Sequence, residues 1–189
     1  MASLPASAAP GATDGPGSGS APSPGAATGR GGKSDAPGPG TSGSDASRRC
    51  VAANLAPALV SNGQEMNSEY FDLRLRNKGS GACVLQGYPG VSLADAQGRR
   101  IGEPAARGSD GGAAGRSVTL KPGQSAHAVV KTAGEGISEG DCWAAAASVI
   151  VYPPGSKESV ATDGLDGLRV CGDVFTVGPV TDTAPLAGG

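Results

Sequence analysis

Residues 77–93 constrain the fold more than any other stretch of this chain; they read Asn-Lys-Gly-Ser-Gly-Ala-Cys-Val-Leu-Gln-Gly-Tyr-Pro-Gly-Val-Ser-Leu. Glycine and serine at 79–81 favour a chain reversal, because glycine adopts turn conformations at little steric cost. Cys83-Val-Leu then predicts a short strand, and Tyr88-Pro89-Gly90 predicts a turn with proline near its first central position. A new strand begins at Val91. The stretch therefore predicts short strands joined by tight turns.

The rest of the chain beyond residue 48 has the same character. Residues 70–75 alternate apolar and charged side chains, which predicts a strand with one buried face. Residues 55–60 contain Pro57 and predict an edge strand, and residues 61–64 predict a turn. Further strands are expected at 91–93, 99–101, 118–120, 126–131, 148–152, 159–161, 168–170 and 174–177, with a hairpin turn at 95–98 and loops at 102–116 and 133–141. The pattern predicts an all-β fold, an immunoglobulin-like antiparallel β-sandwich over residues 48–181.

The first 47 residues form a low-complexity arm in which 37 residues are Ala, Gly, Pro or Ser. Such a segment buries too little apolar surface to offset the ~1–2 kcal/mol per residue that backbone ordering costs. We therefore expect residues 1–47 to be a disordered tether, or a disordered leader without a role. Residues 182–189 are expected to be a frayed tail.

Four cysteines, Cys50, Cys83, Cys142 and Cys171, lie in the predicted sandwich. Four cysteines allow three pairings, and we favour the sequential one, Cys50–Cys83 with Cys142–Cys171. Aromatic residues make up only 3% of the chain, so the core is modest and cross-links matter for stability. Zinc and redox sites are not expected, because both use closely spaced cysteine pairs that this sequence lacks.

The composition argues against several functions. A net charge of −2 gives no electrostatic reason to expect nucleic-acid binding. No run of about 18 apolar residues occurs, so no membrane span is expected. We expect no cofactor and no metal, and a monomer. A partner in the cell wall or an envelope protein is the expectation, although the sequence does not identify it.

Titratable residues do not form a recognisable catalytic set. His127 is the only histidine and is expected to be a partly exposed strand residue. No Gly-x-Ser-x-Gly motif is present to position a nucleophilic serine. Glu135, Glu139 and Asp141 favour a solvated acidic loop over a calcium site, because their spacing is not that of a calcium loop. No catalytic residue is therefore predicted.

Three aromatic residues, Tyr88, Trp143 and Tyr152, are candidates for a ligand platform. Exposed rings bind ligands well because they offer a large rigid contact area. The alternative is that these rings only stabilise the fold, with Trp143 packed on its neighbouring disulfide and Tyr152 covering a sheet edge.

The order of motifs resembles one known family. It comprises Cys50, Leu75-Arg-Asn77, Lys78-Gly79-Ser80, the block from Cys83 to Leu93, Asp95-Ala-Gln-Gly98, the Val118–Gly123 segment and a late cysteine pair. This order, over residues 50–180, is similar to the actinobacterial family catalogued as domain of unknown function 4232. The resemblance implies an exported or lipid-anchored envelope domain, often behind a tether of this composition. It implies no catalytic residues.

The expected location is therefore extracytoplasmic, either secreted or attached to the envelope. No export signal is visible, and Cys50 follows Arg49 and not the small residues of a lipidation motif. We expect the targeting segment to have been removed or to lie upstream; the alternative is a cytoplasmic protein with reduced cysteines. The expected function is a non-catalytic binding or structural module. The alternative is a secreted enzyme or enzyme inhibitor acting through the 102–116 or 133–141 loop.

Overall fold

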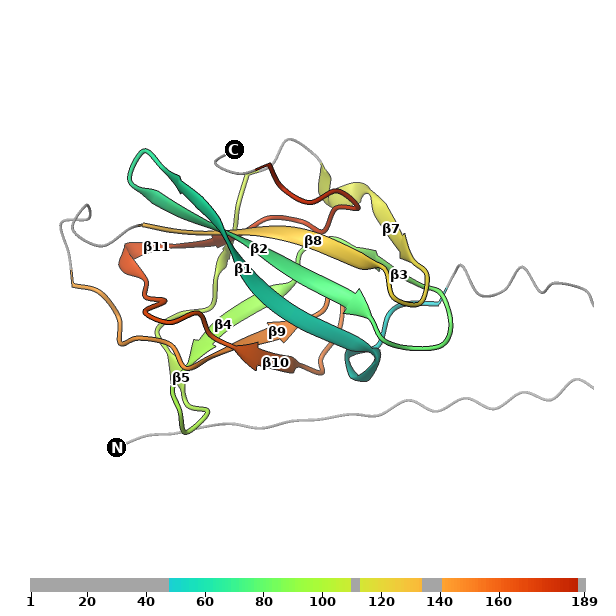
Figure 1. Cartoon of the computed structure of the whole chain (residues 1–189), viewed down its shortest axis with the longest axis horizontal. Coiled ribbons are helices and arrows are strands. Elements are labelled where there is room, and N and C mark those ends of the chain that lie inside the picture. The colour runs from blue at the N-terminus through green and yellow to red at the C-terminus, as the bar shows by residue number, and fades with distance from the viewer. Residues whose placement is uncertain (1–47, 110–112, 134–140, 187–189) are drawn as a thin grey trace, which may run out of the picture. The chain divides into compact units, whose positions relative to one another are not determined.

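The computed structural model describes residues 48–109, 113–133 and 141–186, and these form a β-sandwich (Figure 1). Eleven strands and two short 3-10 helices, η2 and η3, occur in the described residues. The predicted sandwich is confirmed, and so is its bracing by two disulfides. The elements are η2 Ala52–Asn54, β1 Leu55–Glu65, β2 Ser68–Asn77, β3 Cys83–Gln86, β4 Gly90–Ala94, β5 Arg100–Ile101, β6 Ala106–Arg107, η3 Ala113–Gly115, β7 Ser117–Leu120, β8 Ser125–Ala133, β9 Ser148–Tyr152, β10 Val160–Asp163 and β11 Cys171–Val177.

The strands form two principal sheets and one ribbon. The larger sheet has the order β1-β2-β8-β11-β6, and the smaller has the order β10-β9-β4-β5. Strands β3 and β7 form a separate two-stranded ribbon. Pairing is antiparallel except between β6 and β11, which run parallel. The predicted loop at 102–116 therefore contributes a short strand to the edge of the larger sheet.

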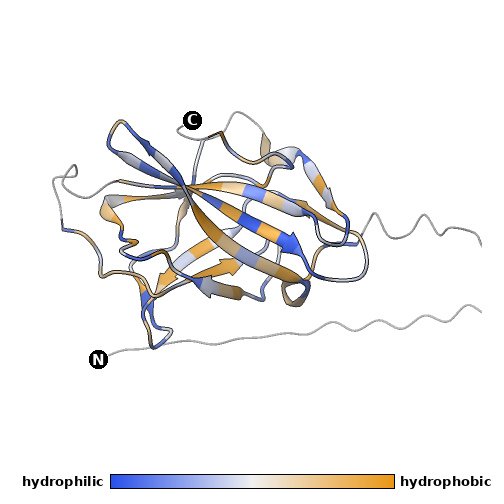
Figure 2. Cartoon of the chain, in the orientation of Figure 1, coloured by the Kyte–Doolittle hydropathy of each residue, from blue (hydrophilic) through white to orange (hydrophobic). Residues whose placement is uncertain are grey.

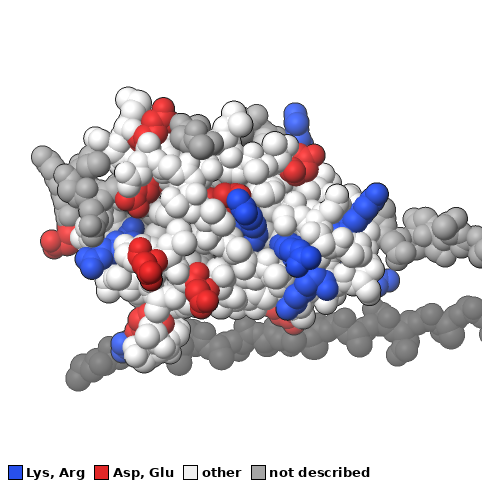
Figure 3. All heavy atoms as spheres, in the orientation of Figure 1, with Lys and Arg blue, Asp and Glu red and all other residues white. Residues whose placement is uncertain are grey.

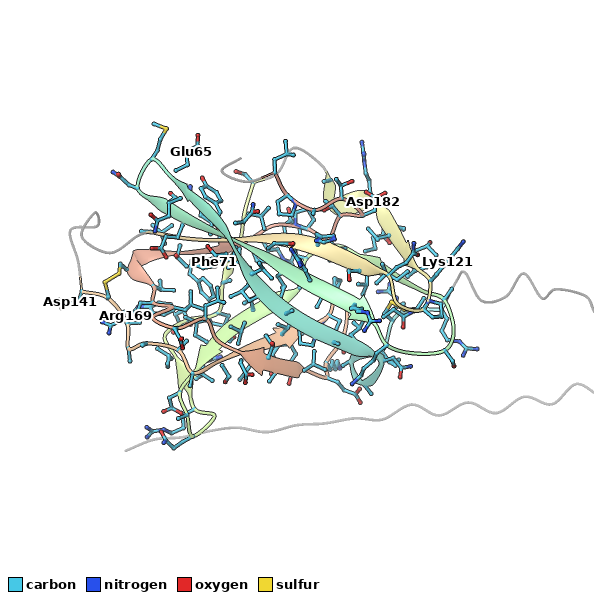
Figure 4. The ribbon with its side chains drawn as sticks, in the orientation of Figure 1. Glu65, Phe71, Lys121, Asp141, Arg169 and Asp182 are labelled. Carbon is cyan, nitrogen blue, oxygen red and sulfur yellow. A yellow bond between two sulfur atoms is a disulfide. The ribbon has the colours of Figure 1, made fainter. Side chains whose placement is uncertain are left out.

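The core lies between the two principal sheets and is built by alternation along each strand. In β8, every second side chain from Ala126 to Thr132 is buried, and β2 contributes Phe71, Leu73 and Leu75 to the same layer. Figure 2 shows the alternation as apolar and polar bands along β2, and Figure 4 shows Phe71 among the strands. Val149 and Val151 of the smaller sheet are fully buried against this layer. The core is aliphatic, as the low aromatic content requires.

The turn predicted at 61–64 is wrong, because β1 continues through it to Glu65. The pairing of β1 with β2 shifts register between Ser61 and Gly63, and Gly63 has φ 107°. A bulge of this kind takes up one extra residue without ending the strand. The chain reverses instead at Met66 and Asn67, which both have positive φ, as the central residues of a tight hairpin turn require.

Two other local predictions are corrected by the structure. Residues 168–170 are not a strand, although Leu168 and Val170 are buried. Their carbonyls accept hydrogen bonds from the backbone of Ala146 and Trp143, so an irregular segment holds them in the core. The bend near Tyr88 falls at Gly87, which has φ 98°, and β4 already begins at Gly90.

Two disulfides join Cys50 to Cys83 and Cys142 to Cys171, which confirms the sequential pairing. Figure 4 shows them at opposite ends of the folded part, one beside Asp141 and the other on the side of Lys121. The first ties the incoming chain to β3, since Cys50 also donates its N–H to the Val84 carbonyl. Cys50, Cys83 and Cys171 are themselves buried, so each bridge joins segments that already pack into the core.

Removing either disulfide is expected to weaken the fold strongly. The cysteine pairs are 33 and 29 residues apart in sequence, and loops of that length predict a loss of ~3.5 kcal/mol in the free energy of unfolding for each bridge. We expect Cys50→Ala/Cys83→Ala and Cys142→Ala/Cys171→Ala to lower the urea midpoint by similar amounts. Equal midpoints for wild type and both double variants, or free thiols in the folded protein, would contradict the structure.

The β4–β5 hairpin predicted at 95–98 is confirmed, and Asp95 organises it. The Arg99 N–H, the Arg99 guanidinium and the Gln97 N–H all donate to its carboxylate, at 2.8–2.9 Å. These donors, the Arg99 N–H above all, hold the pKa of Asp95 below its ordinary value of 3.8.

A lowered pKa in the folded state means that Asp95 stabilises the hairpin above the unfolded value and stops doing so as pH falls through the folded value. We expect NMR titration of the Asp95 carboxyl to give a midpoint below 3.8, and Arg99→Ala to raise that midpoint. A wild-type midpoint at or above 3.8 would show that these hydrogen bonds do not form in solution.

Candidate functional site

The structure places the three candidate ring residues in different environments. Trp143 packs edge-on against Phe175, with ring centroids 6.0 Å apart. It also covers Gly102, where a Cβ would lie 2.4 Å from the indole ring. The Tyr88 hydroxyl donates to the Gly108 carbonyl at 3.3 Å. Trp143 and Tyr88 therefore stabilise the packing of loops on the sandwich.

Tyr152 differs from the other two because 40% of its surface is exposed. It ends β9, directly opposite Gly90 of β4. A Cβ on Gly90 would lie 3.3 Å from the Tyr152 Cβ, so the missing side chain leaves room for the tyrosine to lie against the sheet. Strand β9 lies between β10 and β4, so Tyr152 belongs to an inner strand and not to the sheet edge that the sequence suggested.

An open hollow of about 510 Å³ surrounds Tyr152 on the outer face of the smaller sheet. Ile150, two residues earlier on β9, continues its apolar floor, and Ser92 lies opposite Ile150. Arg100 and Pro104 form part of its rim. This arrangement, the Tyr152 hollow, offers an aromatic face beside a hydrogen-bond donor, which suits a ligand that has both apolar and polar surface.

A second group of polar residues lies on the outer face of the larger sheet. Nδ1 of His127 lies 3.0 Å from both carboxylate oxygens of Asp72, and Nε of Arg74 donates to one of them at 2.7 Å. The Asp72 side chain is only 3% exposed and that of His127 is 15% exposed. His127 is partly exposed, as expected from the sequence, and its backbone pairs with that of Thr181.

The Asp72–His127 pair has the orientation of a carboxylate-supported imidazole. An ionised carboxylate only accepts hydrogen bonds, so toward an ionised Asp72 the donor is Nδ1 of His127, which leaves Nε2 for other partners. The sequence analysis did not predict this pair, although the position of Asp72 in its strand gave one signal for it. Asp72 is on the polar side of its alternating strand, which indicates a polar neighbour. Its neighbour could not be identified from the sequence, because only the register of β2 on β8, with Asp72 opposite Val129, brings His127 close.

The remaining predicted features give little further chemistry. Residues 134–140 of the acidic loop, with Glu135 and Glu139, lie outside the described residues. Within the ranges that the structure describes, no group of three His, Cys, Asp or Glu side chains is placed to hold a metal ion. The four cysteines are all paired. No described helix has the length and apolarity needed to cross a bilayer.

Comparison with known proteins identifies a family but no characterised relative. Residues 50–181 match the model of a family described as a domain of unknown function (DUF4232). No curated protein and no solved structure matches this chain. The match spans the whole sandwich, from the first disulfide cysteine to the backbone pairing of Thr181 with His127. The chain therefore belongs to the DUF4232 family.

Proposed function

We propose that this protein is a non-catalytic binding module that works outside the cytosol and holds its ligand in the Tyr152 hollow. One observation carries the proposal: an exposed tyrosine lies on a rigid sheet face, opposite a glycine that leaves room for it. The ring lies against Gly90, where a Cβ would be 3.6 Å from Cδ2 and 3.7 Å from Cγ, so part of its side-chain freedom is already lost before binding.

The disulfides support an extracytoplasmic location. Disulfides persist in oxidising compartments and are rare in the cytosol, where thiols are kept reduced. Both bridges lie where irregular chain meets the sandwich, so the fold relies on them. A composition rich in Ala, Gly, Pro and Ser over residues 1–47 is also suited to a tether at an envelope surface.

The ligand class that fits the Tyr152 hollow is a glycan of the cell wall. One face of a sugar ring carries C–H groups that pack on an aromatic ring, and its hydroxyls need polar partners nearby. Tyr152 and Ile150 supply the apolar floor, and Arg100 supplies the donor. Within the described residues Arg100 forms no ion pair, so its guanidinium can bond a ligand.

Substituting Tyr152 tests this proposal directly. We expect Tyr152→Ala to reduce co-sedimentation of the full chain with isolated cell-wall sacculi by about tenfold, because one stacked ring contributes on the order of 1–3 kcal/mol to an interface. Tyr152→Phe is the matched control and should retain binding, since it keeps the ring. Equal sedimentation of wild type and Tyr152→Ala, or failure of the wild type to bind, would overturn the proposal.

A secreted hydrolase is the second candidate, and the Asp72–His127 pair is the observation that favours it. If the module is non-catalytic, His127→Ala removes only one partner of a buried carboxylate. We then expect a loss of about 1–3 kcal/mol in the free energy of unfolding, with sacculus binding retained. A hydrolytic activity of the wild type that disappears in His127→Ala, while the fold persists, would establish the enzyme instead.

A further inference from the structure

A second, smaller pocket lies where the chain enters the sandwich, away from the Tyr152 hollow. Its volume is about 320 Å³. Arg48 and Arg49 form one wall, and the turn before β3 forms another with Ser80 and Gly81. Asn54 also lines it. Val51, Ala82 and Cys83 add apolar surface, and no Asp or Glu is among the described lining residues, so the charge of this entry pocket is basic.

The walls of the entry pocket are held in place by the fold. Asn77 is buried, and its amide nitrogen donates to the carbonyls of Gly81 and Leu120 at 2.9 and 3.0 Å. Its amide oxygen accepts the Gly79 N–H at 2.9 Å, so one side chain fixes the turn. On the opposite wall, Val84 donates its N–H to the Arg48 carbonyl at 2.9 Å, beside the Cys50–Cys83 disulfide.

The two arginines are positioned but not neutralised. Within the described residues, neither Arg48 nor Arg49 takes part in an ion pair. The Arg49 guanidinium lies against Gly155, a turn residue that is not among the lining residues of the pocket, where a Cβ would be 2.6 Å from Nη1. Figure 3 shows further Lys and Arg side chains gathered over the end of β2, where Arg76 and Lys78 are exposed. The local field therefore attracts anions.

Backbone donors add to this charge. The N–H groups of Ser80 and Gly81 donate no hydrogen bond within the described part of the chain. Guanidinium forks bind the oxygens of a phosphate in pairs, and exposed backbone N–H groups of a turn suit the same anion. A tetrahedral phosphate can accept from both walls at once, which a planar carboxylate does less well.

We propose that the entry pocket binds a phosphate group, held by Arg48 and Arg49 on one side and by the Ser80–Gly81 turn on the other. The group could be a free phosphate or the phosphate of a lipid headgroup, because the same donors fit both. The site shares no lining residue with the Tyr152 hollow, so the phosphate proposal and the glycan proposal can be tested independently.

The test is an NMR titration of the full, oxidised chain with sodium phosphate at constant ionic strength, with sodium chloride and sodium acetate as comparison salts. Phosphate is expected to shift the Ser80 and Gly81 amide signals saturably, and the other two salts are not. Arg49→Gln should weaken the phosphate affinity by about tenfold, because it removes the charge and the paired donors of the guanidinium. Arg116→Gln, an exposed arginine outside the pocket, should leave it unchanged.

Vesicles distinguish the two sources of phosphate. Arg49-dependent sedimentation with phosphatidylglycerol vesicles, and not with pure phosphatidylcholine, assigns the site to a lipid headgroup; saturable binding of inorganic phosphate alone assigns it to a free phosphate. The proposal is overturned if neither probe binds, or if chloride and acetate cause the same shifts. It is also overturned if Arg49→Gln and Arg116→Gln behave alike while both variants keep the wild-type spectrum elsewhere.

Discussion

The ladder between β2 and β8 is the interaction on which the rest of the structure depends. It runs without interruption from Ser68 opposite Ala133 to Arg76 opposite Ser125. Side chains alternate between the two faces of a strand, so a slip of one residue would move the apolar row of β2 to the solvent and its charged row into the core. The same register sets Arg74 opposite His127 and brings Asp72 within hydrogen-bond distance of the imidazole. Core and outer face are thus fixed together.

The two candidate ligand surfaces use different properties of this scaffold. The Tyr152 hollow lies on a sheet face and depends on a pair of residues on neighbouring strands, one large and one without a side chain. The entry pocket lies at one end of the sandwich and depends on turns that a buried asparagine and a disulfide hold in place. In both, strand pairing or backbone hydrogen bonds hold the main chain in place before a ligand binds, which lowers the entropy lost on binding.

Much of this fold follows from local patterns, and the exceptions have physical causes. The alternation in residues 70–75 and the Asp95–Gly98 turn are local signals, and both were predicted correctly. The Ser61–Gln64 stretch has the composition of a turn, but β1 continues through it because a bulge at Gly63 takes up the extra residue. The apolar pattern of Leu168 and Val170 predicted a strand, but the N–H groups of Ala146 and Trp143 donate to their carbonyls and hold an irregular segment there.

The candidate sites were harder to predict because they depend on pairings between strands that are distant in sequence. Tyr152 stood out as an aromatic residue, but its hollow exists only because β9 pairs with β4 and sets Gly90 opposite. The Asp72–His127 pair joins residues 55 positions apart, and the entry pocket joins Arg48 and Arg49 to Ser80 and Gly81. The hydrophobic periodicity of a sequence cannot predict such contacts, since they arise from the pairing of distant strands.

The order of the two sulfur bridges along the chain has a consequence for biogenesis. Each cysteine bonds to the next one in sequence, so the two closed loops neither overlap nor enclose one another. A polypeptide that enters an oxidising compartment from its amino end exposes both members of the first bridge before either member of the second. Oxidation in order of arrival therefore yields the native pairing directly, and thiol–disulfide exchange is needed only to repair errors.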